Sequence, residues 1–190
     1  MDTHNRLDEQ DAIQRLKNAD MRGLEALVSL HQLRAIRAAY FITQDLSLAE
    51  DIVQDPFLKL RGSIKGFDQS RAFAPWFLRS VVNAAIKAAR RQSRLVPIDD
   101  EAVEGQLSEL GSGPETVESH FEQSEFQEQV WLALQALSPR QRAAIVQRYY
   151  LEMSEKEMSV HLDAPPGTVK WLLNAARRNL KALLGKEVEK

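Results

Sequence analysis

Hydrophobic residues recur every three or four positions along most of the chain, which is the spacing of one face of an α-helix. The pattern predicts no β-strand. It predicts four helices in the first half, over about residues 8–19, 22–43, 48–62 and 72–93. It predicts four more in the second half, over about residues 126–136, 139–150, 155–162 and 167–184. The sequence therefore predicts an all-α fold.

Several predicted helix starts carry a capping box, in which a serine at the N-cap is answered by Glu or Gln three residues later. Pro139 strengthens one of them, because a proline at the first helical position loses no hydrogen bond. Three capping boxes are present, at Ser47 with Glu50, Ser138 with Gln141, and Ser154 with Glu157.

One segment lacks the helical pattern. Residues 96–125 contain Gly111-Ser112-Gly113-Pro114, many carboxylates and few large apolar side chains. Such a composition is typical of a linker with little structure of its own. We therefore expect a small helical domain over 10–95, an acidic flexible linker over 96–125, and a second small helical domain over 126–186.

The charge is segregated along the chain. The formal net charge is −2, but residues 24–95 carry +5, residues 96–128 carry −10 and residues 129–190 carry +4. Two basic blocks of this kind indicate domains that bind a polyanion. Two ordinary domains joined by a solvated linker fit the same charges, so composition alone leaves both interpretations open.

The composition argues against several classes of site. The chain has no cysteine, and its four histidines stand apart in sequence, so we expect no metal site and no cofactor. It has no nucleophile–base set, carboxylate pair or phosphate loop, so we expect no catalytic site and no enzyme. No apolar run approaches the ~20 residues of a membrane span, and the first residues do not resemble a signal peptide. We expect a cytoplasmic protein without membrane insertion.

The second basic block has the pattern of a helix-turn-helix over residues 154–184. A short capped helix is followed by Asp163-Ala164-Pro165-Pro166-Gly167 and then by a long helix. Asp tolerates left-handed backbone geometry, and the prolines prevent the first helix from continuing. This arrangement favours a DNA-recognition helix, although an ordinary surface helix with a basic face remains the alternative.

The two faces of this long helix separate on a helical wheel. Leu172 lies at the edge of the predicted core face, which holds Val169, Leu173, Ala176, Leu180, Leu183 and Leu184. The opposite face holds Lys170, Trp171, Asn174, Arg178 and Lys181. Lys170 and Asn174 are suited to base edges, whereas Arg177, Arg178 and Lys181 are suited to phosphates. Trp171 on the outer face fits either a thymine methyl or a protein interface.

The first basic block ends in a helix with an apolar and a basic face. The apolar face holds Phe73, Phe77, Val81 and either Ala84 or Ala85. The basic face holds Arg79, Asn83, Lys87, Arg90 and Arg91. Trp76 lies near its beginning. Basic residues beside aromatic rings suit single-stranded nucleic acid, although Trp76 taken alone more often belongs to a core.

The helix before it has an acidic-polar face with Glu50, Asp51, Gln54 and Asp55. Its other face is apolar and contains Phe57. An acidic face repels DNA, so it fits either a basic protein partner or plain solvent exposure.

Taken together, three segments resemble the extracytoplasmic-function (ECF, group IV) sigma factors of the sigma-70 superfamily. AEDIVQDPF is similar to the segment that binds core RNA polymerase, and FAPWFLRSVVN to the helix that opens the −10 element. LSPRQRAAIVQRYYLEMSEKEMSVHL with PPGTVKWLLNAARRNL is similar to the C-terminal domain that binds the −35 element. The resemblance covers about residues 10–186.

The resemblance implies roles for individual residues. Binding to core RNA polymerase, whose β′ coiled coil and β flap are the expected contacts, is implied for Asp51, Gln54, Asp55 and Phe57. Contact with −10 promoter DNA is implied for Phe67, Arg71, Phe73, Trp76, Arg79, Asn83, Lys87, Arg90 and Arg91. The loop Gly66–Phe73 would receive a flipped base. Contact with −35 DNA is implied for Thr168, Lys170, Trp171, Asn174, Arg177 and Arg178.

The implied function is promoter-specific transcription initiation, restrained by an anti-sigma factor, with the acidic linker threading the RNA exit path of the polymerase. Pro56, Lys87 and the pair Trp171-Leu172 depart from the family pattern. They motivate one alternative, a sigma-like mimic that binds an anti-sigma factor without driving transcription. A stand-alone helix-turn-helix regulator is the other.

Overall fold

The computed structural model describes residues 3–95 and 129–184, and within these two ranges it contains helices and turns but no strand. The prediction of an all-α fold is confirmed. The predicted acidic linker, 96–125, lies outside the described residues. The first range folds as α1 (Thr3–Lys17), α2 (Arg22–Thr43), α3 (Leu46–Ser63), the 3-10 turn η1 (Ile64–Gly66) and α4 (Phe73–Leu95). The second contains a helix over 129–135, then α6 (Pro139–Ile145), η3 (Val146–Tyr150), α7 (Glu155–His161) and α8 (Pro166–Leu184).

Two of the three predicted capping boxes are present. At both Ser138 and Ser154 the serine accepts a backbone hydrogen bond, and the Gln or Glu three residues later answers it. The box predicted at Ser47 is wrong. α3 begins at Leu46, and its N-cap is Asp45, whose carboxylate accepts the backbone N–H of Leu48 at 2.9 Å. Ser47 therefore lies inside the first turn.

The interior proline of α3 does not end the helix. α3 continues through Pro56 to Ser63. Val53 and Phe57, on either side of the proline, are both buried, and α3 packs against α2 and α4. This packing compensates for the backbone hydrogen bond that proline cannot donate.

The N-terminal domain is built around α2, which contacts α1, α3 and α4. Its core contains a cluster of aromatic rings. The centre of the Phe77 ring lies 4.5 Å from the centre of the Phe57 ring and 5.7 Å from that of the Phe73 ring. Phe67, from the loop before α4, meets Phe73 edge-on at 5.5 Å. Because this loop ring is buried with the helix rings, the cluster fixes the start of α4 against the rest of the domain.

Gly23 allows α1 to lie close to α2. A Cβ atom at this position would stand 2.3 Å from the carbonyl oxygen of Ala12 and 2.6 Å from the backbone nitrogen of Leu16. Neither atom can move without displacing α1, so glycine is required here for close packing.

The C-terminal domain packs α8 against α6 and α7. Val169 and Leu173 on α8 are buried with Met158 of α7. The turn between α7 and α8 contains Asp163 at a φ of 46°, which confirms the predicted left-handed position. η3 is a π-helical turn, and it brings the chain from α6 toward α7.

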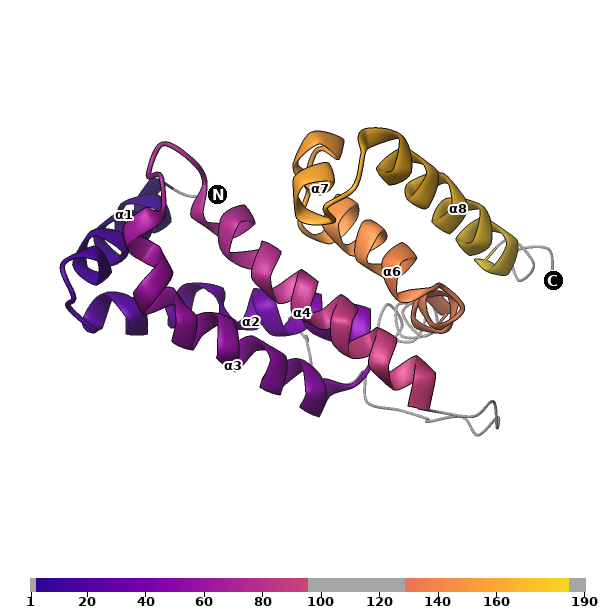
Figure 1. Ribbon diagram of the computed structural model, residues 1–190, viewed down its shortest axis with the longest axis horizontal. Coiled ribbons are helices and arrows are strands. Elements are labelled where there is room, and N and C mark those ends of the chain that lie inside the picture. Colours follow the sequence, from indigo (N-terminus) through magenta and orange to yellow (C-terminus); the bar gives the residue numbers. More distant parts are fainter. Residues whose placement is uncertain (1–2, 96–128, 185–190) are drawn as a thin grey trace, which may run out of the picture.

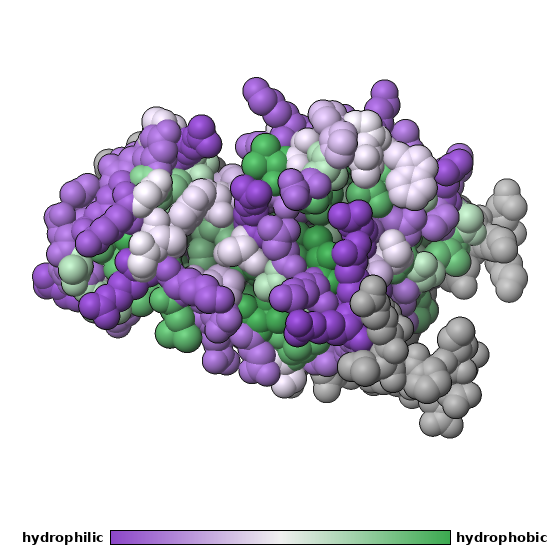
Figure 2. All heavy atoms as spheres, viewed as in Figure 1, coloured by the Kyte–Doolittle hydropathy of each residue, from purple (hydrophilic) through white to green (hydrophobic). Residues whose placement is uncertain are grey.

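The two domains pack against each other. α6 contacts both α2 and α4, α7 contacts α4, and η3 contacts α2. In Figure 1, α4 lies between α3 on one side and the C-terminal helices on the other. Figure 2 shows mostly hydrophilic residues on this face, with hydrophobic residues visible mainly along its middle. Buried residues of both domains belong to one continuous core.

Candidate nucleic-acid and polymerase interfaces

A basic stripe runs along the exposed face of α4. We use this name for Arg79, Asn83, Lys87, Arg90 and Arg91, all of which are exposed. Val81 and Ala85 on the opposite face are fully buried, as the helical period requires. The structure thus places all five residues, as the sequence predicted, on one side of one helix.

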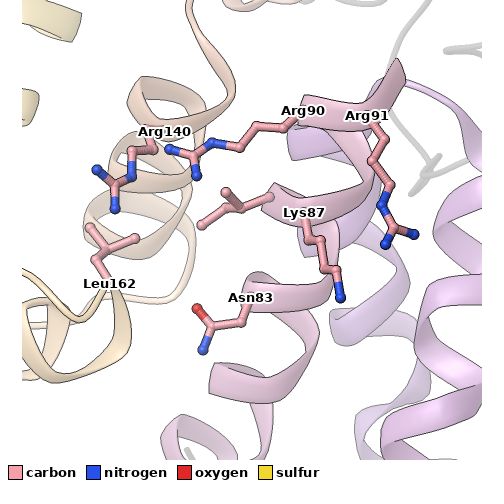
Figure 3. Close-up of a pocket in the computed structure, with 7 residues that line it drawn as sticks. Asn83, Lys87, Arg90, Arg91, Arg140 and Leu162 are labelled. Carbon is pink, nitrogen blue, oxygen red and sulfur yellow. The ribbon is translucent and has the colours of Figure 1, made fainter. Parts of the chain in front are cut away.

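All of the stripe except Arg79 borders a cleft between the two domains. The cleft has a volume of about 410 Å³ and is lined by Asn83, Ile86, Lys87, Arg90, Arg91, Arg140 and Leu162. Figure 3 shows Arg90 extending from α4 toward Arg140 on α6, with Leu162 facing Asn83 across the gap. Every charged residue in this lining is a cation, so the cleft favours anions. Arg140 is a lining residue that the sequence patterns did not single out.

Three predicted contact residues belong to the core. Phe57, Phe67 and Phe73 are buried within the ring cluster. A ring that packs against its own domain has no face left for DNA or polymerase, so we correct their predicted role from contact to support. Trp76 is half-buried. The centre of its ring lies 4.8 Å from the centre of the Phe67 ring and 5.7 Å from that of the Phe73 ring. This position combines the two alternatives for Trp76, because one part of the ring supports the core and the other remains accessible.

The loop before α4 borders a second cavity. Lys17 of α1 donates to the carbonyl oxygen of Phe67 at 2.7 Å, and exposed Arg71 lies 3.5 Å from Asp68. The cavity, of about 510 Å³, is lined by the loop, by α1, α2 and the start of α4, and by residues 151–153 of the C-terminal domain. His31 in its wall lies 2.8 Å from Glu9. These walls come from segments far apart in sequence, so no local pattern could have predicted the cavity.

The acidic face of α3 is open to solvent. Asp51, Gln54 and Asp55 are exposed, and Asp55 makes a surface ion pair with Lys59 at 3.1 Å. Leu58 is 73% exposed on the same helix. Leu58 is thus an exposed apolar residue that the sequence patterns did not single out.

The outer face of α8 presents Lys170, Asn174 and Arg178 to solvent, as predicted. Trp171 is 61% exposed, whereas Leu172 is 4% exposed. Leu183, predicted to lie in the core, is 41% exposed, because α8 extends beyond the helices that cover it. Thr168 is half-buried at the start of the helix.

Arg177 is not a freely projecting cation. It donates from Nε to the hydroxyl of Tyr149 at 2.8 Å, and its guanidinium lies 5.7 Å from the centre of the same ring. Tyr149, itself exposed, therefore fixes the direction of Arg177. The sequence patterns did not single out this tyrosine.

His161, at the end of α7, is held in its neutral form. Burial, with a smaller effect from the charge of Arg79, lowers its pKa from 6.5 to about 4. The proximity of Arg79 shows that α7 lies near the first residue of the basic stripe. Within the described ranges, no group of three metal-ligating side chains is present, and no helix is long and apolar enough to cross a membrane.

Comparisons with known proteins agree with this architecture. The family model "Sigma-70 region 2" matches residues 27–95, and "Sigma-70, region 4" matches residues 127–180. The chain is 28% identical over 179 residues to the ECF RNA polymerase sigma factor SigW of Bacillus subtilis, covering 90% of this chain and 94% of that protein. It is 27% identical over 177 residues to the ECF RNA polymerase sigma-E factor of Escherichia coli K12, covering 90% and 91%.

Two solved structures share the fold. CnrH, in complex with the cytosolic domain of CnrY, matches with a TM-score of 0.63 at 21% identity, covering 94% of this chain and 98% of that one. RpoE of Bartonella quintana, in complex with the anti-sigma factor NepR, matches with a TM-score of 0.60 at 24% identity, covering 85% and 94%.

The chain belongs to the ECF group of the sigma-70 family. It is a sigma factor, a protein that directs transcription, and the predicted family is confirmed.

Proposed function

We propose that this ECF sigma factor docks on core RNA polymerase through α3, contacts the −10 element through α4 and contacts the −35 element through α8. One observation supports the proposal above all. The fold exposes three chemically distinct faces: an acidic face on α3, the basic stripe on α4 and a basic face on α8. Separate faces allow one protein to hold the polymerase and two DNA elements at once.

The stripe on α4 is suited to the melted −10 strand. Arg79, Lys87 and Arg91 provide cations for phosphates, and Asn83 between them provides an amide for a base edge. Arg90 adds a further cation. Trp76 offers a partly accessible ring on which an unstacked base can rest. Arg71 and the loop Gly66–Phe73 lie beside the 510 Å³ cavity, where a flipped base would enter.

The outer face of α8 is suited to the major groove at the −35 element. Lys170 and Asn174 lie on successive turns and face solvent, so both can reach base edges. Arg178 and Arg177 stand toward the far end of that face, where phosphates are expected. Thr168 adds a hydroxyl near the start of the helix. Trp171 lies among them, in a position to contact a thymine methyl.

The acidic face of α3 is suited to a basic protein surface. Asp51, Gln54 and Asp55 would contact the β′ coiled coil, with Leu58 as an apolar centre, and the C-terminal domain would meet the β flap. We also propose an anti-sigma factor as a regulatory partner, since RpoE of Bartonella quintana is seen with the anti-sigma factor NepR. The acidic linker would enter the RNA exit path. The polymerase supplies the chemistry, so this chain acts as a non-enzymatic specificity factor in the cytoplasm.

Run-off transcription on pooled genomic promoter fragments tests the proposal. Purified chain and bacterial core polymerase are combined, with polymerase alone as the control. Discrete new transcripts are expected. A stable complex with polymerase but no transcript would favour the mimic, and tight duplex binding without polymerase would favour the stand-alone regulator.

Charge reversal on α3 tests the polymerase site directly. Asp51→Lys is expected to weaken binding to core polymerase by ~10-fold or more, because it places a cation against a basic partner. Glu25→Lys makes the same charge change at an exposed position of α2 and serves as the matched control. Equal affinities for the two variants would exclude Asp51 from the interface.

A further inference from the structure

Two side chains of α1 hold the loop that precedes α4. Lys17 donates from Nζ to the carbonyl oxygen of Phe67 at 2.7 Å, and this contact is partly buried. Gln14 accepts a hydrogen bond from the side-chain amide of Gln69 at 3.2 Å. We call these two bonds the loop tether. In Figure 1 the loop between α3 and α4 lies beside α1.

The two tether residues lie on the same side of α1. Lys17 follows Gln14 by three positions, and residues with this spacing are neighbours on the surface of a helix. Ala12 and Leu16, on another side of α1, are buried, and Gly23 allows α1 to approach α2 closely. The tether therefore attaches the loop to a helix whose own position is fixed by packing.

The loop closes on itself just beyond the tether. The N–H of Arg71 bonds to the carbonyl oxygen of Asp68 at 3.1 Å, and the Asp68 carboxylate accepts the N–H of Ser70 at 3.0 Å. Hydrogen bonds from Ser70 lower the pKa of Asp68, and the charges of Arg71 and Lys17 lower it further. The result is one turn, whose orientation depends on how the chain is held at Phe67.

Phe67 is held at its side chain and at its backbone. Its ring is buried, and the ring centre lies 5.5 Å from that of Phe73 and 4.8 Å from that of Trp76. The bond from Lys17 fixes the direction of the peptide group that follows Phe67. All four residues of the turn, 68–71, are exposed, so burial does not hold them. Their direction depends on the backbone at Phe67 and on the tether.

We propose that Lys17 and Gln14 are positioning residues for −10 recognition, which hold the loop Gly66–Phe73 through the loop tether in the orientation that receives a flipped base. The inference rests on the proposed role of this loop in the −10 contact. It gives α1 a part in promoter recognition that acts through the loop backbone. The match to sigma-70 region 2 begins at residue 27, so α1 lies outside it.

The tether favours binding because it limits the orientations that the loop samples. The apparent dissociation constant of a ligand rises as the fraction of binding-competent molecules falls. The 510 Å³ cavity beside the loop has Gln10 and Ile13 of α1 in its wall, on the same side of the helix as Gln14 and Lys17. One helix thus forms part of the cavity wall and also holds the loop that borders the cavity.

Hydrogen exchange of the free chain, followed by mass spectrometry, measures whether the tether holds the loop. Lys17→Met keeps an unbranched side chain of similar length and removes the donor. We expect the peptide 64–73 to exchange roughly fivefold faster or more in this variant than in the wild type. Arg15→Met removes the same charge from an exposed residue of α1 that pairs with Asp11, and as the matched control it should leave this exchange unchanged. Lys17→Arg retains a donor and should restore slow exchange.

A cycle of protein and DNA changes tests whether the held loop serves the flipped base. The chain is assembled with core polymerase and bound to a labelled promoter found by run-off transcription. Abasic sites replace the non-template bases of the −10 element one at a time. The wild type should lose most affinity at one of these positions, where the flipped base is missing.

Lys17→Met should weaken binding to the intact promoter by roughly fivefold or more. At the position of the flipped base, the variant and the wild type should bind the abasic promoter equally, because the contact that the tether supports is already missing. Abasic sites elsewhere should cost both proteins the same factor. A merely structural role of Lys17 would weaken binding to all of these promoters alike.

A second variant covers the case in which Lys17→Met disturbs α1. Gln69→Ala removes the other bond of the tether from the loop side and leaves α1 unaltered. It should change loop exchange and promoter affinity in the same direction by about twofold, because this bond is neutral and exposed. Circular dichroism should show the same helix content in both variants as in the wild type.

Three results would overturn the inference, and they differ in what else they refute. Unchanged loop exchange in both variants would show that the tether does not hold the loop. Equal losses for Lys17→Met and the wild type at every abasic position would show that the held loop does not serve the base. Both results leave the proposed function intact. A wild type that is indifferent to every −10 base would refute the proposed role of the loop itself.

Discussion

Two adjacent residues of α8 differ sharply in their exposure. Trp171 is 61% exposed and Leu172 is 4% exposed, since consecutive residues of a helix point about 100° apart. Trp171 is therefore accessible to a partner, whereas Leu172 packs within the chain. Replacing each by alanine therefore tests two different properties of α8.

The magnitudes follow from this burial. Leu172→Ala removes a buried side chain from a small domain, and we expect a loss of about 2–5 kcal/mol in the free energy of unfolding. Trp171→Ala should change that free energy by no more than about 0.5 kcal/mol. If the indole contacts a base in the −35 element, its removal should cost about 1–3 kcal/mol of promoter affinity, or roughly 5- to 150-fold.

Two measurements separate the outcomes. Urea unfolding followed by far-ultraviolet circular dichroism gives stability, and anisotropy of labelled promoter DNA with the assembled polymerase gives affinity. Trp171→Ala should lower affinity with normal unfolding. A large loss of stability would refute its exposed position, and unchanged affinity in a stable variant would refute the DNA contact and favour a protein interface at Trp171.

Three further predictions concern the fold. Gly23→Ala should destabilise the N-terminal domain by about 2–4 kcal/mol in urea unfolding, since the new Cβ would displace the α1 backbone; an unchanged midpoint would refute the close approach. Asp45→Ala should cost about 1 kcal/mol and Ser47→Ala should cost less, because Asp45 caps α3; equal losses would contradict this assignment. His161, with its folded pKa lowered to about 4 by burial, should make stability fall as pH decreases from 6.5 toward 4, by up to about 3 kcal/mol; His161→Gln should flatten that slope, and an equally steep slope would exclude His161 as its source.

Local sequence patterns predicted the start of a helix correctly where no second capping residue stood nearby. The capping boxes at Ser138 and Ser154 formed as expected. Ser47 and Glu50 matched the same pattern, but Asp45 just upstream is an equally good cap, and α3 begins one residue after it. Choosing between the two caps depends on where the buried side chains of α3 meet α2, which is a tertiary property.

Helical periodicity likewise predicted the faces of α4 and α8, and it failed where coverage from other helices decides burial. Leu183 lies on the apolar side of α8 and is still exposed, because the helices of residues 3–95 and 129–184 leave it uncovered. Phe67 stands in a loop with no periodicity, yet it is buried among rings from α4. Helical periodicity predicts which side of its own helix a residue lies on, whereas the burial of that residue also depends on the neighbouring helices and loops.

By itself, the sequence determined the all-α fold, the approximate helix bounds, the basic and acidic faces and the family. Each of these depends on side chains within a few turns of one another, where spacing along the chain fixes spacing in three dimensions. Only the tertiary structure decided the packing between domains. Gln44 and Arg142 are 98 positions apart in sequence, and their contact exists because α2 and α6 pack together. The 410 Å³ cleft between α4 and the C-terminal domain follows from that packing and from no local signal.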